Sequence, residues 1–166
     1  MSLFDRRYLL LGGGAFALTA GCQFTPAYGP GGSAEALFGE IEIKAPVSTD
    51  DFLLTQTLED RLGRGTVISP YQLDYGLSLE SAGIGVDRDG TSQRVQVTGD
   101  VAYALRRRGE EGALAKGVVR NFTGYSNTGN TVSTAAAKRA ATERLIRILA
   151  DDVVERILLA SQDLPL

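Results

Sequence analysis

Three stretches in the middle of the chain alternate apolar and polar residues, which is the pattern of β-strands with one buried face. The clearest begins at Tyr71, where every second residue through Leu79 is apolar. Turn-forming residues separate the stretches, and Asp89–Gly90 readily adopts the positive φ of a hairpin. The predicted strands are 71–81, 93–108 and 113–126, and the turns between them are 87–90 and 109–112. The sequence therefore predicts three antiparallel strands joined by hairpins.

Two segments show helical spacing instead. The first follows a short strand at 40–46 and starts with Ser48 or Thr49 as the N-cap. Its apolar stripe consists of Phe52 or Leu54, then Leu58 and Leu62. The second helix covers about 134–160, with Ser133 or Thr134 as its cap. The order strand, helix, three strands, helix predicts an α+β two-layer sandwich, in which a four-stranded mixed sheet packs two helices on one face.

The N-terminal segment has the composition of an export signal. Arg6 and Arg7 precede an uncharged run, 8–20, which is too short to span a bilayer as a mature helix. A buried core helix is the alternative, but three consecutive glycines from Gly12 would each cost about 1 kcal/mol in a helix. We therefore predict a signal peptide of the lipoprotein type at 1–21.

The sequence TAGC before and at Cys22 resembles the bacterial lipobox, in which the cysteine becomes the lipid-bearing N-terminus of the mature protein. A free periplasmic thiol is the alternative for this cysteine. Gln23 follows it, and the absence of aspartate at this position favours the outer membrane, with both Sec and twin-arginine export left open. We predict a lipidated tether at 22–38 and one α+β domain at 39–166.

Composition excludes several classes of site. The chain has no histidine and a single cysteine, so zinc sites and triads that use histidine are excluded. The net charge of −3 gives no indication of nucleic-acid binding. Asp50–Asp51 and the pair Asp87 and Asp89 are the candidates for acid–base catalysis, but helix capping and turn formation explain them better. We expect no catalytic residue, no metal, and no cofactor other than the covalent lipid on Cys22.

A basic cluster is the strongest candidate binding site. It consists of Arg106, Arg107, Arg108, Lys116 and Arg120, on two strands that are predicted to pair. Guanidinium and ammonium groups gathered in this way suit phosphate groups. The alternative is a solvated strand end that resists edge-to-edge aggregation, and Asp100 and Glu110 nearby would reduce the positive field.

Four segments of the chain are distinctive when taken together. They are CQFTPAYG from Cys22, RVQVTGDVAYAL, the GYSN loop, and the alanine-rich helix STAAAKRAATERLIRILADDVVERIL. In this order they resemble the LptE family of lipopolysaccharide (LPS)-assembly lipoproteins. The family usually has glycine after the cysteine, where this chain has Gln23.

The resemblance implies a non-enzymatic outer-membrane lipoprotein on the periplasmic side, which supports and plugs an LptD-like β-barrel and helps to deliver LPS. Basic residues of such proteins meet LPS phosphates, which implies this role for the cluster as a region, whereas only Cys22 corresponds residue for residue. An auxiliary lipoprotein of an ABC-type envelope lipid transporter and a small envelope hydrolase are the alternative functions.

Overall fold

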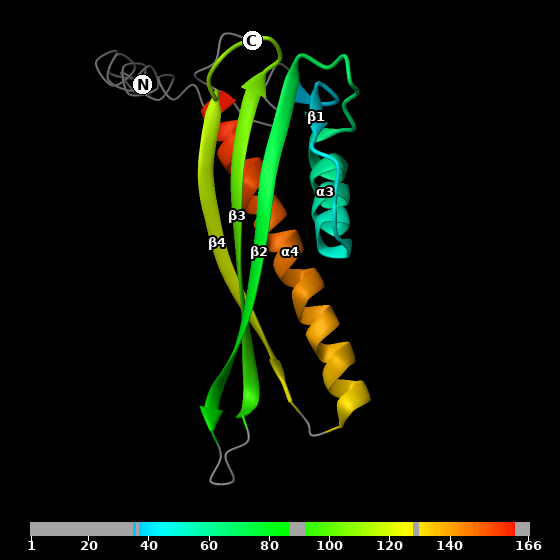
Figure 1. Cartoon of the computed structure of the whole chain (residues 1–166), viewed down its shortest axis with the longest axis vertical. Coiled ribbons are helices and arrows are strands. Elements are labelled where there is room, and N and C mark those ends of the chain that lie inside the picture. The colour runs from blue at the N-terminus through cyan, green and yellow to red at the C-terminus, as the bar shows by residue number, and fades with distance from the viewer. Residues whose placement is uncertain (1–34, 36, 87–91, 128–129, 162–166) are drawn as a thin grey trace, which may run out of the picture.

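A mixed four-stranded sheet and two long helices make up the computed structural model, which describes residues 35, 37–86, 92–127 and 130–161 (Figure 1). The elements are β1 (Ile41–Ile43), α3 (Thr49–Leu62), β2 (Tyr71–Val86), β3 (Ser92–Arg107), β4 (Ala115–Ser126) and α4 (Thr131–Ser161). The predicted α+β class, with its mixed sheet and two helices, is confirmed. The predicted signal peptide, Cys22, most of the predicted tether and the turn at 87–90 lie outside the described residues.

The strands lie in the order β1-β2-β3-β4. β1 is parallel to β2, with Ile41 opposite Tyr71, and α3 connects these two strands. The other two pairs are antiparallel, so Tyr75 lies opposite Tyr103 and Asp100 lies opposite Arg120. β2 and β3 are much longer than β1, and Figure 1 shows both strands extending well past the first turn of α3.

Local sequence determines where α3 begins and ends. Ser48 is the N-cap, and its Oγ accepts a hydrogen bond from the backbone N–H of Asp51 at 3.0 Å. The Asp51 carboxylate in turn accepts from the Ser48 N–H at 3.1 Å, which completes a capping box. The helix ends at Gly63, where φ is 76°. A side chain is strained at that φ, and an added Cβ would lie 2.5 Å from the Gly39 nitrogen.

The start of α4 differs from the sequence prediction. The helix begins at Thr131, about three residues early, and the predicted caps Ser133 and Thr134 lie within it. Asn130 performs the capping role, because its Oδ1 accepts from the backbone N–H of Val132 at 3.0 Å and of Ser133 at 3.2 Å. Its side chain thus satisfies two of the free donors of the first turn.

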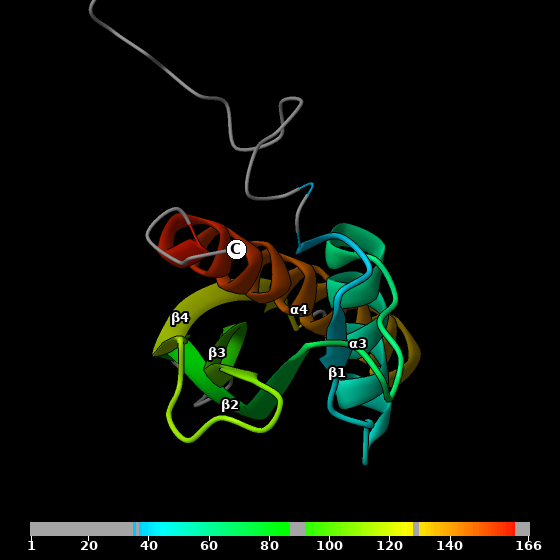
Figure 2. The same ribbon diagram turned by 90° about the horizontal axis from the view of Figure 1, so that it is seen from above.

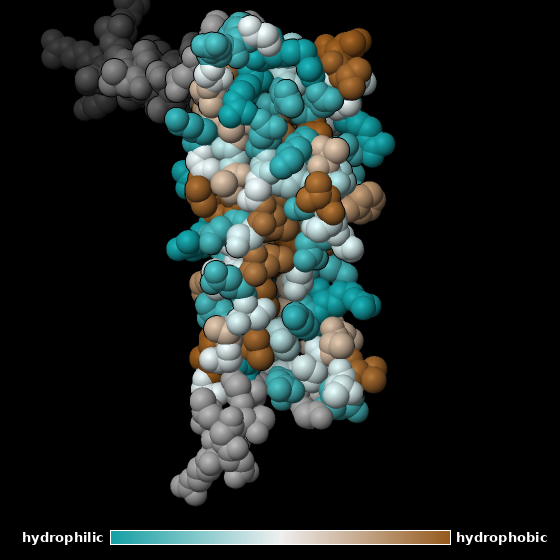
Figure 3. Space-filling model, in the orientation of Figure 1, coloured by the Kyte–Doolittle hydropathy of each residue, from teal (hydrophilic) through white to brown (hydrophobic). Residues whose placement is uncertain are grey.

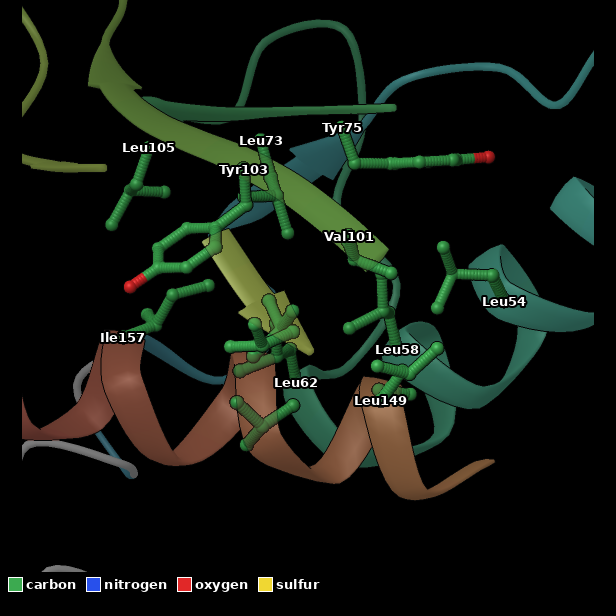
Figure 4. Close-up of a cluster of buried hydrophobic side chains, with 14 of the residues drawn as sticks. Leu54, Leu58, Leu62, Leu73, Tyr75, Val101, Tyr103, Leu105, Leu149 and Ile157 are labelled. Atoms are coloured by element: carbon green, nitrogen blue, oxygen red, sulfur yellow. The ribbon is translucent and has the colours of Figure 1, made fainter. Parts of the chain in front are cut away.

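The core lies on the face of the sheet formed by the odd-numbered positions of β2, β3 and β4, which we call the inner face. Figure 2 shows α4 running along the sheet and α3 beside β1, and Figure 4 shows side chains of both helices among the buried residues of this face. The Thr55 hydroxyl of α3 is hydrogen-bonded to the Tyr75 hydroxyl at 2.7 Å. An added Cβ on Gly99 would lie 2.7 Å from Leu149 of α4, so the glycine allows α4 to approach β3 closely. The buried residues labelled in Figure 4 are Leu54, Leu58, Leu62, Leu73, Tyr75, Val101, Tyr103, Leu105, Leu149 and Ile157.

Candidate functional site

The candidate site occupies the opposite face of the sheet, formed by the even-numbered positions of β2, β3 and β4, which we call the outer face. The register sets its residues in rows across the strands. Asp74, Ala104 and Lys116 form one row. Ser78, Asp100 and Arg120 form another, and a row of small residues with Val118 lies between them. Figure 3 shows hydrophilic side chains over much of the molecule in the orientation of Figure 1, with smaller hydrophobic groups between them.

Two of the predicted arginines form ion pairs on the outer face. Arg106 is bonded to Asp74 of the neighbouring strand. Arg120 is bonded to Asp100, the residue directly opposite, with its Nη2 donating to Oδ2 at 3.1 Å. The hydrogen bond from Arg120 is the main cause that lowers the pKa of the Asp100 carboxyl, and the same bond raises the pKa of Arg120. Both guanidinium groups therefore have carboxylate partners that an incoming anion would have to displace.

The next two arginines lie at the end of β3 beside other polar groups. The Arg107 guanidinium lies over the Tyr71 ring, 5.6 Å from its centroid, and donates to the Tyr71 hydroxyl at 3.3 Å. That hydrogen bond is the largest cause of the raised pKa of Arg107, and Glu110 lies 3.5 Å away. Arg108 forms an ion pair with Glu42 of β1 and donates from Nε to the Ser69 carbonyl at 3.1 Å. These contacts fix the two side chains at one end of the sheet.

Lys116 differs from the four arginines. It is exposed on β4 opposite Ala104, and within the part of the chain that the structure describes it forms no salt bridge. Arg106 is its diagonal neighbour across the strands, at a separation of roughly 7–8 Å that long side chains can bridge. Arg120 lies four residues further along the same face of β4. The structure therefore brings Arg106, Lys116 and Arg120 together on the outer face, with Lys116 as the cation available to an anion.

The carboxylate partners were the part of this site that sequence reasoning largely missed. Asp100 and Glu110 were expected to weaken the positive field, but the roles of Asp74 and Glu42 were not foreseen. The signal for Asp74 lay in the register of β2 and β3, which sets Asp74 two positions from Gln72, the partner of Arg106. Four of the five predicted cations thus have carboxylate partners, which leaves the cluster close to neutral.

A hollow with a volume of about 590 Å³ lies between the start of α3 and the first half of α4. Its lining includes Phe52, Lys138 and Arg139 together with the acidic side chains of Asp50 and Glu143. The two basic and two acidic side chains there balance, whereas the predicted basic cluster has one cation more than its carboxylate partners, so the outer face is the stronger candidate for binding anions. No group of three or more metal-ligating side chains occurs among the described residues, and none of the described helices is long and apolar enough to cross a membrane.

The sequence was next compared with models of known protein families. The model of the LptE family, described as lipopolysaccharide-assembly, matches residues 38–157, which include every strand and most of α4. The chain belongs to the LptE family. The resemblance predicted from the sequence is therefore confirmed. A comparison with curated protein sequences finds no match.

Solved structures share the fold of this LptE-family chain. A crystal structure of a protein described as a lipoprotein from Caulobacter crescentus CB15 matches with a TM-score of 0.61 at 19% identity, over 78% of this chain and 93% of that one. Rare lipoprotein B from Shewanella oneidensis matches with a TM-score of 0.57 at 11% identity, over 74% and 95% of the two chains. A minor lipoprotein from Acinetobacter baumannii matches with a TM-score of 0.53 at 14% identity, over 72% of this chain and 88% of that one. At these identities the likeness concerns the fold.

Proposed function

We propose that this protein is a non-enzymatic lipoprotein subunit of an LPS translocon in the outer membrane. In this role it supports and plugs an LptD-like β-barrel and takes part in delivering LPS to the outer leaflet. The observation that carries the proposal is the match to the lipopolysaccharide-assembly family over residues 38–157. The likeness to the fold of rare lipoprotein B adds support.

The anchor in this proposal is a lipid on Cys22, which holds the domain on the periplasmic side of the outer membrane. Each buried CH₂ group of an acyl chain contributes about 0.8 kcal/mol, so several chains hold a protein firmly on a bilayer. Replacing the only sulfhydryl, by Cys22→Ser, removes the acceptor. We expect metabolic labelling with a fatty acid to mark the wild-type protein and to miss this variant; persistent labelling of the variant would contradict the assignment.

Within the same proposal, the phosphates of LPS bind to the outer face, with Lys116 making the first contact and Arg106 and Arg120 on either side. An ammonium group without a carboxylate partner can bind phosphate at no cost in broken ion pairs. The two arginines can join the contact only when their carboxylates yield. We therefore expect LPS affinity to depend more on Lys116 than on either arginine.

Binding measurements on single variants test this assignment. Lys116→Ala should weaken binding of LPS about tenfold, as expected for the loss of one charge-assisted contact. Lys138→Ala is the matched control, because Lys138 is an exposed lysine in the hollow beside α3. Unchanged affinity in the first variant, or a loss in the second alone, would move the site away from the outer face.

Depletion of the protein in cells tests the role as a whole. We expect surface LPS to fall and maturation of the LptD-like barrel to fail, because the barrel would lack its partner subunit. Normal levels of both would refute the proposal. Normal barrel maturation with a defect in lipid transport at the inner membrane would indicate an auxiliary subunit of an ABC-type transporter instead.

A further inference from the structure

The segment that joins α3 to β2 exposes two adjacent aliphatic side chains at one end of the molecule. Val67 is 74% exposed and Ile68 is 87% exposed. Both lie between Thr66 and Ser69 at the end that also carries β1, and Figure 3 shows a hydrophobic group over this segment (Figure 1). Two adjacent and largely exposed aliphatic side chains contribute little to the packing of the fold, which makes the turn a candidate contact with another apolar surface.

The turn is held rigidly by hydrogen bonds. The Ser69 N–H donates to the Thr66 carbonyl at 2.9 Å, and the Ser69 hydroxyl accepts from the Thr66 N–H at 2.8 Å. Ser69 itself is buried, and its carbonyl accepts from Nε of Arg108. The Arg108 N–H also donates to the Pro70 carbonyl at 2.7 Å. Val67 and Ile68 therefore protrude from a fixed support.

The chain from the proposed lipid anchor reaches the domain at this same end. Phe38 comes 16 residues after Cys22, and an added Cβ on Gly63 would lie 3.1 Å from the Phe38 ring. Gly63 ends α3 and leads directly into the turn. The tether from an anchor on Cys22 therefore enters the domain beside the turn, whereas the start of α4 lies at the opposite end, roughly 45 Å away along that helix.

We propose that the turn at 66–69 is a membrane contact, in which Val67 and Ile68 insert among lipid acyl chains beside the anchor. The inference rests on the proposed function, since it uses the lipid on Cys22. Two side chains offer far less area than the roughly 800 Å² per partner of a stable protein interface. Insertion into lipid needs no shaped partner surface, and aliphatic side chains without charge suit it.

A tryptophan probe tests the contact, because the chain contains no tryptophan of its own. Ile68→Trp is made in the full-length protein as processed by the cell and is placed in vesicles of phosphatidylethanolamine and phosphatidylglycerol with brominated acyl chains. We expect the emission of the introduced indole to shift to shorter wavelength and to be quenched by bromine. Val132→Trp is the matched control, because Val132 is a similarly exposed aliphatic residue in the first turn of α4, at the far end. Its emission should change in neither way.

A second measurement uses transfer of the lipidated protein from donor to acceptor vesicles. Ile68→Ser should accelerate transfer about tenfold, the effect of removing one buried aliphatic side chain, and Val132→Ser should leave the rate unchanged. Mass spectrometry of Cys22 and sedimentation with vesicles report the anchor separately. Anchored protein without quenching at position 68 would overturn the membrane contact while leaving the anchor intact. If Cys22 carries no lipid, the anchor fails, and quenching of Ile68→Trp by excess vesicles still decides the contact.

Discussion

The two faces of the sheet are made by the same three strands and differ in nearly every physical property. On the inner face, buried odd-numbered positions of β2, β3 and β4 belong to one core cluster with side chains of α3 and α4, and Leu149 of α4 is 0% exposed. On the outer face, the even-numbered positions carry ion pairs, and Val118 is 65% exposed. The contrast shows that period-two alternation separates the packed side chains on one face from the exposed charged groups on the other. The predictions below test that division with matched variants.

The largest difference between the faces should appear when an aliphatic side chain is shortened. Leu149→Ala leaves a cavity beside Gly99 in the core and should lower the free energy of unfolding by about 2–5 kcal/mol. Val118→Ala shortens a side chain that is mostly exposed to solvent and should change the free energy of unfolding by less than about 0.5 kcal/mol. Denaturant unfolding of both variants measures the two effects. Equal losses would mean that the outer face is as closely packed as the inner one.

Adding a side chain in place of glycine should separate the faces next. The Cβ of Gly99→Val would meet Leu149 at 2.7 Å and Leu79 at 3.0 Å, so we expect a cost of about 1–3 kcal/mol. Gly76 on the outer face has nothing within 4 Å of an added Cβ. Gly76→Val should therefore be neutral or slightly stabilising in thermal unfolding. A strongly destabilised Gly76→Val would show that the outer face is covered in the free protein.

These two comparisons rest on features that the sequence predicted well. The strict alternation from Tyr71 and the spacing of the leucines of α3 predict which side chains are buried on the inner face. Burial itself produces this apolar periodicity, so it can be recognised from the sequence alone. The alternation of β4 is weaker in the sequence, and the structure buries Val119 and exposes Val118. β2 also continues to Val86, past its predicted end, because pairing with β3 holds a glycine-containing stretch that has no clear pattern.

The hydrogen bond that joins α3 to the inner face should give a smaller effect, with a pH signature. Tyr75→Phe leaves the buried Thr55 hydroxyl without this partner and should cost about 0.5–1.5 kcal/mol near neutral pH. Burial raises the pKa of Tyr75 above its ordinary value of 10.0. Because the fold favours the protonated phenol, this contribution is complete below about pH 10 and is lost as the pH rises through the raised pKa. As the pH rises across that range, the free energy of unfolding should fall more steeply for the wild type than for the variant; identical slopes would contradict this.

The smallest effect should come from the exposed ion pair of the outer face. Arg120 lowers the pKa of Asp100 below its ordinary value of 3.8, chiefly through a hydrogen bond. The stabilisation is therefore present above pH 3.8 and is lost as the pH falls through the lowered pKa. Arg120→Ala should return the pKa of Asp100 toward 3.8 in an NMR titration of the carboxyl group. Arg147→Ala, which breaks a pair within α4, is the control and should leave it unchanged.

The candidate site was only partly predictable from the sequence, for a physical reason. The sequence shows the cluster formed by Arg106, Arg107 and Arg108. It does not show which carboxylates from other strands pair with them. Asp74 and Glu42 lie 32 and 66 residues from the arginines that they neutralise. Only the register of the whole sheet brings them together, so the special position of Lys116 becomes visible only in the fold.

The central claim is that this chain is the partner subunit of an outer-membrane translocon. Affinity purification of the mature protein from outer membranes, in mild detergent, tests it most directly. We predict that a large LptD-like β-barrel co-purifies in a fixed ratio and that LPS is retained with the complex. Recovery of inner-membrane transport proteins in place of the barrel would contradict the account.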